Sequence, residues 1–308
     1  MRQVNALTVD VEDYFQVSAF EGCVDRASWD SYPLRVERNT GRLLDLLASR
    51  GVKGTFFVLG WVARRCPKLV RDIHRRGHEV ACHGYGHQRV TQLSRAAFRE
   101  DVRLSKALLE DLTGEAVLGY RAPSYSIAPD TLWAFDELFE AGYRYDSSVF
   151  PIRHDLYGIQ DWPRFPFLLK PCEAGWGPAP GAVSSLTEAR EGEELVEFPI
   201  TTLMRYGVGI PIAGGGYFRL FPYAFTRWGL NRINRREGRP FVFYLHPWEI
   251  DPEQPRIAGA SAKSRFRHYL NLDKTQPRME RLLDDFSFGR LRDLLVGASA
   301  GTGAGAPG

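Results

Sequence analysis

The sequence predicts an α/β fold in which parallel strands curve into a closed or nearly closed barrel. Along much of the chain, a stretch with helical character ends in glycine and an apolar strand follows at once. Glycine suits the left-handed residue that closes a helix, and strands that alternate with helices pair in parallel. About seven strand candidates occur, a number that fits a barrel. The 308 residues, 44% of them hydrophobic, are enough for one large core.

The predicted elements alternate from the first residues onward. The strand candidates are residues 6–11, 52–59, 78–82, 117–120, 143–146, 195–198 and 240–245. Helical stretches that close with glycine precede four of them and cover residues 43–51, 69–77, 132–142 and 231–238. A further helix is expected over residues 96–112, with Ser94 as its N-cap, because serine can accept a hydrogen bond from the free N–H groups there.

Three segments depart from this rhythm. Residues 151–194 are rich in proline and aromatic residues and predict an irregular loop or hairpin insertion. Residues 255–296 regain helical character and predict a C-terminal helical extension. Residues 297–308 are rich in glycine and alanine and predict a disordered tail. We therefore expect a single domain over residues 1–296.

Composition and charge exclude several functional classes. Lys plus Arg is 40 and Asp plus Glu is 37, and this near-balance argues against a nucleic-acid partner. The four cysteines form no C-x-x-C pair, which argues against a structural zinc knuckle. The first residues show no apolar signal core, and no apolar run reaches the roughly 18 residues that a membrane helix needs. The sequence predicts a cytoplasmic protein without an integral membrane segment.

Carboxylates gather at the end of the first predicted strand. Asp10 and Glu12 project from the same face of a strand because side chains alternate. Two neighbouring carboxylates repel, so the pair is costly unless they share a cation or a proton. A solvated strand end is the alternative interpretation.

Two histidines follow the third predicted strand. His83 and His87 enclose two glycines, which indicates a loop that can turn both imidazoles toward one ion. With a carboxylate from the first strand, the set becomes two histidines and one carboxylate, as in catalytic zinc sites that keep a position open. A glycine-rich turn with incidental histidines is the alternative.

Three more polar residues follow strands. Arg121, Asp146 and His246 each stand at or just after the carboxyl end of a predicted strand. Taken singly, each fits a structural role. Together with the earlier residues they all fall on one rim of the barrel, which is the rim that carries the chemistry in α/β barrels.

These motifs resemble, in order, those of the polysaccharide deacetylase family, the NodB-homology carbohydrate esterases. The matching segments are Thr8 to Asp13, His83 to His87, Arg121 to Pro123, Asp146 to Phe150 and Tyr244 to His246. The resemblance covers about residues 4 to 250 and agrees with a distorted, seven-stranded (β/α) barrel. The aspartate pair that the family carries is not adjacent here, so Glu12 and Asp13 compete as the third metal ligand.

The resemblance implies a role for each motif residue. A divalent metal, zinc in our expectation, is held by His83, His87 and Glu12, with Asp13 as the rival. Strand alternation favours Glu12 because it shares the face of Asp10.

The remaining roles concern proton transfer. Asp10 acts as the base and is paired with Arg121. His246 acts as the acid and is oriented by Asp146.

The implied reaction is removal of N-acetyl groups from amino sugars of a bacterial polysaccharide or its lipid-linked precursor. Tyr125, Tyr217 and Trp248 are candidates for substrate binding. The spacing at the first motif and the absence of a signal segment are similar to a branch with cytoplasmic peptidoglycan deacetylases, allantoinase-like proteins and deacetylases linked to exopolysaccharide and exosortase systems. The alternatives are an allantoinase-like hydrolase of a small amide that needs no metal and a non-catalytic carbohydrate-binding barrel.

Overall fold

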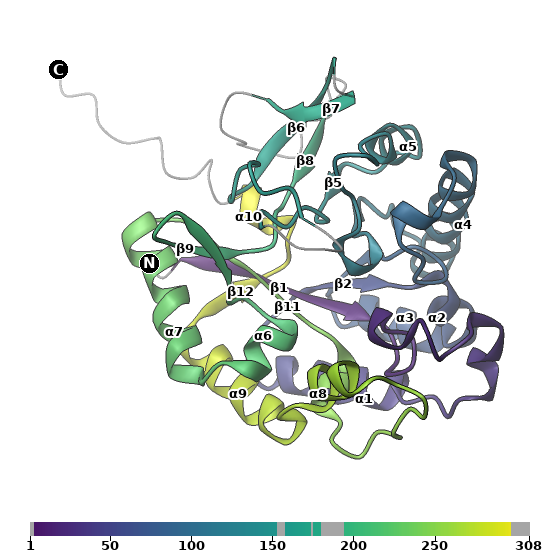
Figure 1. Ribbon diagram of the computed structural model, residues 1–308, viewed down its shortest axis with the longest axis vertical. Helices are drawn as coiled ribbons and strands as arrows, with labels where there is room; N and C mark the ends of the chain where they lie inside the picture. The colour runs from purple at the N-terminus through teal and green to yellow at the C-terminus, as the bar shows by residue number, and fades with distance from the viewer. Residues whose placement is uncertain (1–2, 153–157, 174, 180–193, 297–308) are drawn as a thin grey trace.

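The computed structural model describes residues 3–152, 158–173, 175–179 and 194–296, and its core is a curved, mostly parallel sheet (Figure 1). Seven strands lie side by side in parallel and agree with the seven predicted ones. In spatial order they are β11 (Val242–Leu245), β1 (Val4–Val11), β2 (Thr55–Val58), β3 (Glu79–Cys82), β4 (Gly119–Tyr120), β5 (Tyr145–Asp146) and β8 (Leu195–Glu197). The prediction of an α/β fold with parallel strands is confirmed.

The register of the sheet aligns the carboxyl ends of its strands. One row of paired residues crosses the sheet through Val11, Val58, Cys82, Tyr120, Asp146 and Glu197. Glu12, His83 and Arg121 each come one residue after this row. On the other side of β1, Val9 pairs with Leu245, which brings His246 next to Asp10. Residues far apart in the sequence are therefore neighbours at one rim.

Helices cover the outside of the sheet. They are α1 (Val36–Ala48), α2 (Gly60–Arg65), α3 (Pro67–Arg75), α4 (Arg95–Thr113), α5 (Ala134–Glu140), α6 (Gly215–Leu220), α7 (Tyr223–Arg232), α8 (Ala262–Tyr269), α9 (Leu272–Asp285) and α10 (Asp293–Val296). In α4, the side chain of Ser94 accepts from the Ala97 N–H, as predicted, and Gly114 closes the helix in the left-handed conformation. Among the described residues, no helix has both the length and the apolar composition needed to cross a bilayer.

The gap between β8 and β11 is covered by residues 198–214, which contain the antiparallel hairpin of β9 (Thr202–Arg205) and β10 (Val208–Pro211) and form an isolated β-bridge from Gly214 to Tyr244. The side chain of Thr201 accepts a hydrogen bond from the Val242 N–H, and the Ala213 carbonyl accepts one from the Tyr244 N–H. Gly214 has a φ of 132°, and a Cβ there would stand 1.9 Å from the Tyr244 carbonyl oxygen. Only glycine permits this approach, which brings the start of α6 against β11.

The predicted irregular insertion and the predicted helical extension both contribute strands to the sheet. Within the predicted insertion, β6 (Phe167–Cys172) and β7 (Gly175–Pro178) form an antiparallel hairpin that pairs with β8. The C-terminal extension contains α8, α9 and α10, but it also contains β12 (Ser287–Gly289), which pairs in parallel with β1. The extension is therefore not wholly helical, and it is built into the same sheet. Residues 297–308 lie outside the described residues.

Candidate active site

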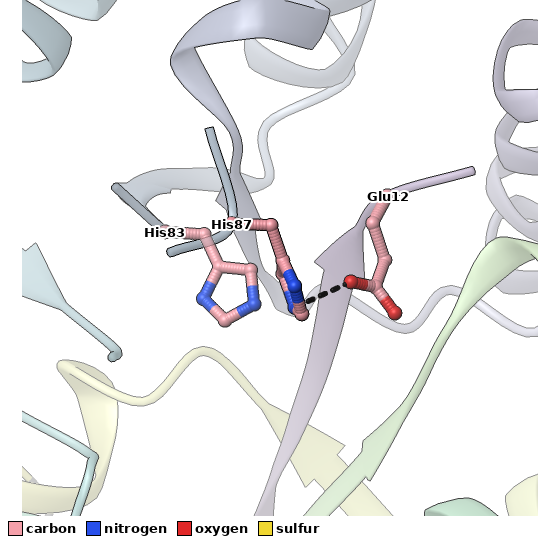
Figure 2. Close-up of side chains that lie close together, drawn as sticks. All are labelled: Glu12, His83 and His87. Carbon is pink, nitrogen blue, oxygen red and sulfur yellow. Dashed lines mark ion pairs between the residues drawn. The ribbon is translucent and has the colours of Figure 1, made fainter. Parts of the chain in front are cut away.

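Glu12, His83 and His87 lie together at the rim (Figure 2). One potential ligand atom from each lies within 4.8 Å of the others, and all three side chains are buried. The Nε2 atom of His87 is 2.7 Å from the Oε2 atom of Glu12. The three residues come from the end of β1 and the loop after β3, which the sheet register brings side by side.

His83 is held in the form that a metal ligand requires. Its Nδ1 atom lies 2.8 Å from the Arg121 carbonyl oxygen, and because a carbonyl can only accept, Nδ1 carries the proton. This leaves the lone pair of Nε2 free. Burial lowers the pKa of His83 to about 4, so the imidazole is neutral near pH 7. Metal-binding histidines commonly show this arrangement, in which the other ring nitrogen donates to a carbonyl.

The loop that carries both histidines is held by residues that the sequence analysis did not identify. Asp101, on α4, accepts hydrogen bonds from the Tyr85 N–H at 3.0 Å. The guanidinium of Arg26 donates to the carbonyl oxygens of Gly86 and His87. An aspartate inside a helix and an arginine in an irregular segment offer no local signal of these long-range contacts.

Glu12 and Asp13 point to different places. Glu12 faces the histidines and accepts a hydrogen bond of 3.1 Å from the indole N–H of Trp248. Asp13 turns away and accepts from the backbone N–H groups of Arg35 and Val36 at the start of α1. Burial raises the pKa of Asp13 to about 6 despite these bonds. The placement agrees with the preference for Glu12 that strand alternation predicts.

The three residues fit a divalent ion. Burial alone would raise the pKa of Glu12, but the charges of His87 and His246 hold it well below its usual range. The Oε2 atom of Glu12 is buried and contacts His87 Nε2 at 2.7 Å. A carboxylate with two imidazoles is a donor set that suits zinc. A cation among them would neutralise the buried negative charge.

Asp10 forms a buried ion pair with Arg121. The Arg121 Nη1 atom donates to Asp10 Oδ1 at 2.6 Å and to the Thr8 hydroxyl at 2.9 Å. The guanidinium is fully buried and stacks over the ring of Phe57. This arrangement fixes the orientation of the Asp10 carboxylate and balances its charge, while its Oδ2 atom faces His246 at 3.8 Å.

The segment after β5 holds Arg121 in place. The Ser147 carbonyl and hydroxyl accept from the Arg121 Nε and Nη2 atoms. The Ser148 hydroxyl donates to Asp146 and accepts from the Ala122 N–H, which ties the loop after β4 to the loop after β5. Asp146 is thus a positioning residue for the strand end that carries Arg121.

The predicted pairing of Asp146 with His246 is wrong. The Nδ1 atom of His246 lies 2.9 Å from Glu249 Oε1, three residues further along the chain, whereas Asp146 contacts Ser148 and the buried Glu197. Pro247 starts a 3₁₀ turn over Pro247–Ile250 that brings Glu249 back beneath the imidazole. The short spacing from His246 to Glu249 was the available signal.

His246 is set up to carry a proton. Burial lowers its pKa, but Glu12, Glu249 and Asp10 outweigh that effect and raise the pKa to about 9. Its Nε2 atom faces the carboxylates of Glu12 and Asp10 at 3.5 Å and 3.8 Å. A protonated imidazole therefore stands beside the proposed base and the candidate ligands.

These groups line a reaction cleft of about 190 Å³. Its walls are Asp10, Glu12, Val17, Ser18, His83, His87, Arg89, Ser124, Tyr125, Tyr244, His246 and Trp248. Arg121 and Asp146, although predicted with the others, are not among the lining residues. Ser124 and Tyr125 both have positive φ, a strained conformation that clusters at functional sites.

The three predicted substrate-binding residues have different surroundings. Tyr125 lines the reaction cleft, while Tyr217 lines an adjoining groove. Trp248 is buried, with the rings of His246 and His268 stacked on it at 5.2 Å and 4.1 Å. The Trp248 indole donates to Glu12 and stacks with His246, so it supports both residues, and its role in substrate binding stays a prediction.

Comparison with known families divides the chain into two matches. Residues 27–145 match the polysaccharide deacetylase family, and residues 147–296 match a domain of unknown function, DUF3473. The first match contains His83 and His87 and the second contains β8, β11 and His246, while β1, Asp10 and Glu12 precede both matches.

Curated relatives agree with this family. The chain is 32% identical over 101 residues to a peptidoglycan-N-acetylglucosamine deacetylase of Bacillus cereus, covering 32% of this chain and 37% of that protein. It is 35% identical over 109 residues to a peptidoglycan deacetylase of Helicobacter pylori, covering 35% and 36%. The chain thus aligns with little more than a third of the length of either relative.

Solved structures share the fold. A putative polysaccharide deacetylase from Mycobacterium smegmatis aligns with a TM-score of 0.56 at 19% identity, over 99% of this chain and 96% of that one. An allantoinase aligns with the same TM-score at 17% identity, over 99% and 93%. By sequence, residues 27–145 match the polysaccharide deacetylase family and residues 147–296 match DUF3473, and the solved structures show that the chain shares their fold.

Proposed function

We propose that this protein is a metal-dependent deacetylase that hydrolyses the N-acetyl group of an amino sugar in a bacterial polysaccharide or its lipid-linked precursor. The observation that carries the proposal is the convergence of three kinds of group in one cleft. The cleft holds a candidate metal triad, an ion-paired carboxylate and a protonated histidine. Hydrolysis of an amide needs an activated water, a base and an acid, and this set supplies candidates for all three.

Glu12, His83 and His87 are the residues that would hold the metal. When bound, a divalent ion would polarise the amide carbonyl and make a water molecule more acidic. Trp248 and the Arg121 carbonyl orient two of these side chains through hydrogen bonds to Glu12 and His83. Because these contacts hold Glu12 and His83 in place, the two side chains would move little when a metal ion binds.

Asp10 and His246 would transfer the protons. Asp10 accepts a proton from a water molecule while the oxygen of that water attacks the carbonyl carbon of the acetyl group. Arg121 keeps the Asp10 carboxylate oriented. His246 donates its Nε2 proton to the amide nitrogen as the carbon–nitrogen bond breaks. The products are acetate and a free amino sugar. Each proton transfer of this kind contributes roughly 10²–10⁴ in rate.

The test compares substrates and metal states of the purified chain. Acetate release from N-acetylglucosamine oligomers and allantoate formation from allantoin should be measured before and after chelation and after return of zinc. We expect activity on the sugar oligomers that chelation abolishes and metal restores. Activity on allantoin alone, unaffected by chelation, would support a small-amide hydrolase, and no activity on either substrate with metal bound would support a binding barrel.

A further inference from the structure

A second hollow opens beside the reaction cleft. This groove, which we call the α6–α8 groove, has a volume of about 320 Å³ and shares Val17, Tyr244, His246 and Trp248 with the cleft. The volume is at the lower end of the roughly 300–1,000 Å³ typical of ligand sites. Because His246 belongs to both hollows, a molecule that reacts in the cleft can extend into the groove.

The outer walls of the groove come from two helices of the DUF3473 region. Tyr217 and Leu220 project from α6, and Phe266 projects from α8. Leu220 is 48% exposed and Phe266 is 60% exposed, so both offer apolar surface at the groove. Rings such as those of Tyr217 and Phe266 can pack against the apolar faces of sugar rings.

The rim of the groove also carries unpaired positive charge. Helix α8 contains Lys263, Arg265 and Arg267 but no acidic residue, and Arg267 lines the groove. No carboxylate of the described chain lies within ion-pair distance of these three side chains, as the ion pairs found there involve other residues. At the other end of the cleft, Arg89 is neutralised by Glu21.

We propose that the α6–α8 groove binds the sugar residues that flank the reacting one, and that it favours glycans carrying a negative charge. This inference rests on the deacetylase function proposed above. Tyr217 and Phe266 contact the flanking rings, and Arg267 pairs with an anionic group, which can be the carboxylate of a uronic acid or a phosphate. The DUF3473 region would then select the polymer as well as complete the barrel.

The test measures kcat/KM for three sets of acetylated oligomers of equal length. One set is neutral, one contains a uronic acid and one ends in a phosphate. We expect Arg267→Gln to lower kcat/KM for the charged sets roughly tenfold more than for the neutral set, since charge-assisted hydrogen bonds are among the stronger ones. Whichever charged set shows the effect identifies the source of the charge.

Arg265→Gln is the matched control. It removes the same charge from the same helix, but Arg265 does not line the groove, so the preference for charged oligomers should persist. Equal effects of both variants, or no preference for charge in the unaltered protein, would overturn the assignment.

Phe266→Ala tests the apolar wall independently of charge. It should raise KM for oligomers while leaving KM for a single acetylated sugar unchanged, because the monomer does not reach the groove. An equal rise for monomer and oligomer would contradict the proposed subsite.

Binding without turnover separates this inference from the proposed function. Calorimetric titration of charged and neutral oligomers into Asp10→Asn, a residue that lines the cleft but not the groove, reports the groove even when no acetate is released. Selective binding of charged oligomers without deacetylation by the unaltered protein would retain the groove and reject the enzyme. Deacetylation without selective binding of charged oligomers would support the deacetylase function and reject the charge-selective groove.

Discussion

The two parts of the chain contribute different chemistry to one cleft. The part before residue 147 supplies Asp10, Glu12 and the two loop histidines, which are buried and held by hydrogen bonds to neighbouring strand ends. The part after it supplies His246 and the exposed, unpaired cations of α8. Buried paired groups suit chemistry that requires fixed geometry, whereas exposed groups can adapt to different polymers.

The largest expected effect on activity comes from Glu12, a candidate metal ligand in the part of the chain before residue 147. Glu12→Ala should remove the bound metal and lower kcat by at least about 10³-fold, because the ion would supply several kcal/mol of stabilisation in the transition state. Metal content and acetate release should be measured on the same preparation.

Asp13→Asn is the control for this variant. Asp13 accepts hydrogen bonds from the start of α1, and asparagine retains an acceptor there, so metal should be retained. Loss of metal from the Asp13 variant but not from the Glu12 variant would reverse the ligand assignment.

The next effect tests the contribution of the second part to the chemistry. His246→Ala should lower kcat by roughly 10²–10⁴-fold, the range for a general acid, with metal content unchanged. Metal analysis together with steady-state kinetics checks both statements. A variant that has lost its metal would show that His246 is a ligand and not the acid.

A smaller effect distinguishes the two candidate partners of His246. Glu249→Gln should lower kcat about tenfold with little change in KM, because it weakens a charge-assisted hydrogen bond to the Nδ1 atom. Asp146→Asn should leave the pH at which His246 titrates unchanged, since Asp146 acts on Arg121 through its serine neighbours. A shift of the His246 pH profile in the Asp146 variant alone would restore the original pairing.

The smallest effect on activity, but a clear one on stability, concerns Glu197. Burial and the nearby charge of Asp146 raise the pKa of Glu197 well above its ordinary 4.5, so the folded state holds a proton that the unfolded state releases. The free energy of unfolding therefore falls as the pH rises above about 4.5, by up to about 1.4 kcal/mol per pH unit.

Glu197→Gln should flatten this decline. Denaturant unfolding at pH 5, 6, 7 and 8 measures it, with Glu194→Gln as a control because Glu194 lies nearby and pairs with Lys170. A slope with pH that stays unchanged in the Glu197 variant would show that this carboxyl does not carry the proton.

The strand pattern made much of this site predictable. Parallel strands end at one edge of a sheet, so residues that follow successive strands were expected to meet there, and Glu12, His83 and His246 do. Side-chain alternation also distinguished Glu12 from Asp13. These inferences depend on local geometry that every parallel sheet shares.

Contacts across the fold were not predictable in the same way. Asp146 was expected to orient His246, but Glu249 does so, because the turn after Pro247 brings its carboxylate to the imidazole. Asp101 gave no signal, since only the packing of α4 against β3 brings it to the histidine loop. The strand β12 was likewise hidden in a segment with helical character.

The sequence by itself predicted the strands along the chain, the rim on which the polar residues gather and, over about residues 4 to 250, the resemblance to the polysaccharide deacetylase family. Those properties follow from periodicity and motif order, which are local along the chain. Only the tertiary structure decided that Glu249 supports His246, that the buried Trp248 stacks with two histidines, and that α6 and α8 border a groove beside the cleft. These features depend on side chains brought together from distant segments, and packing determines their partners.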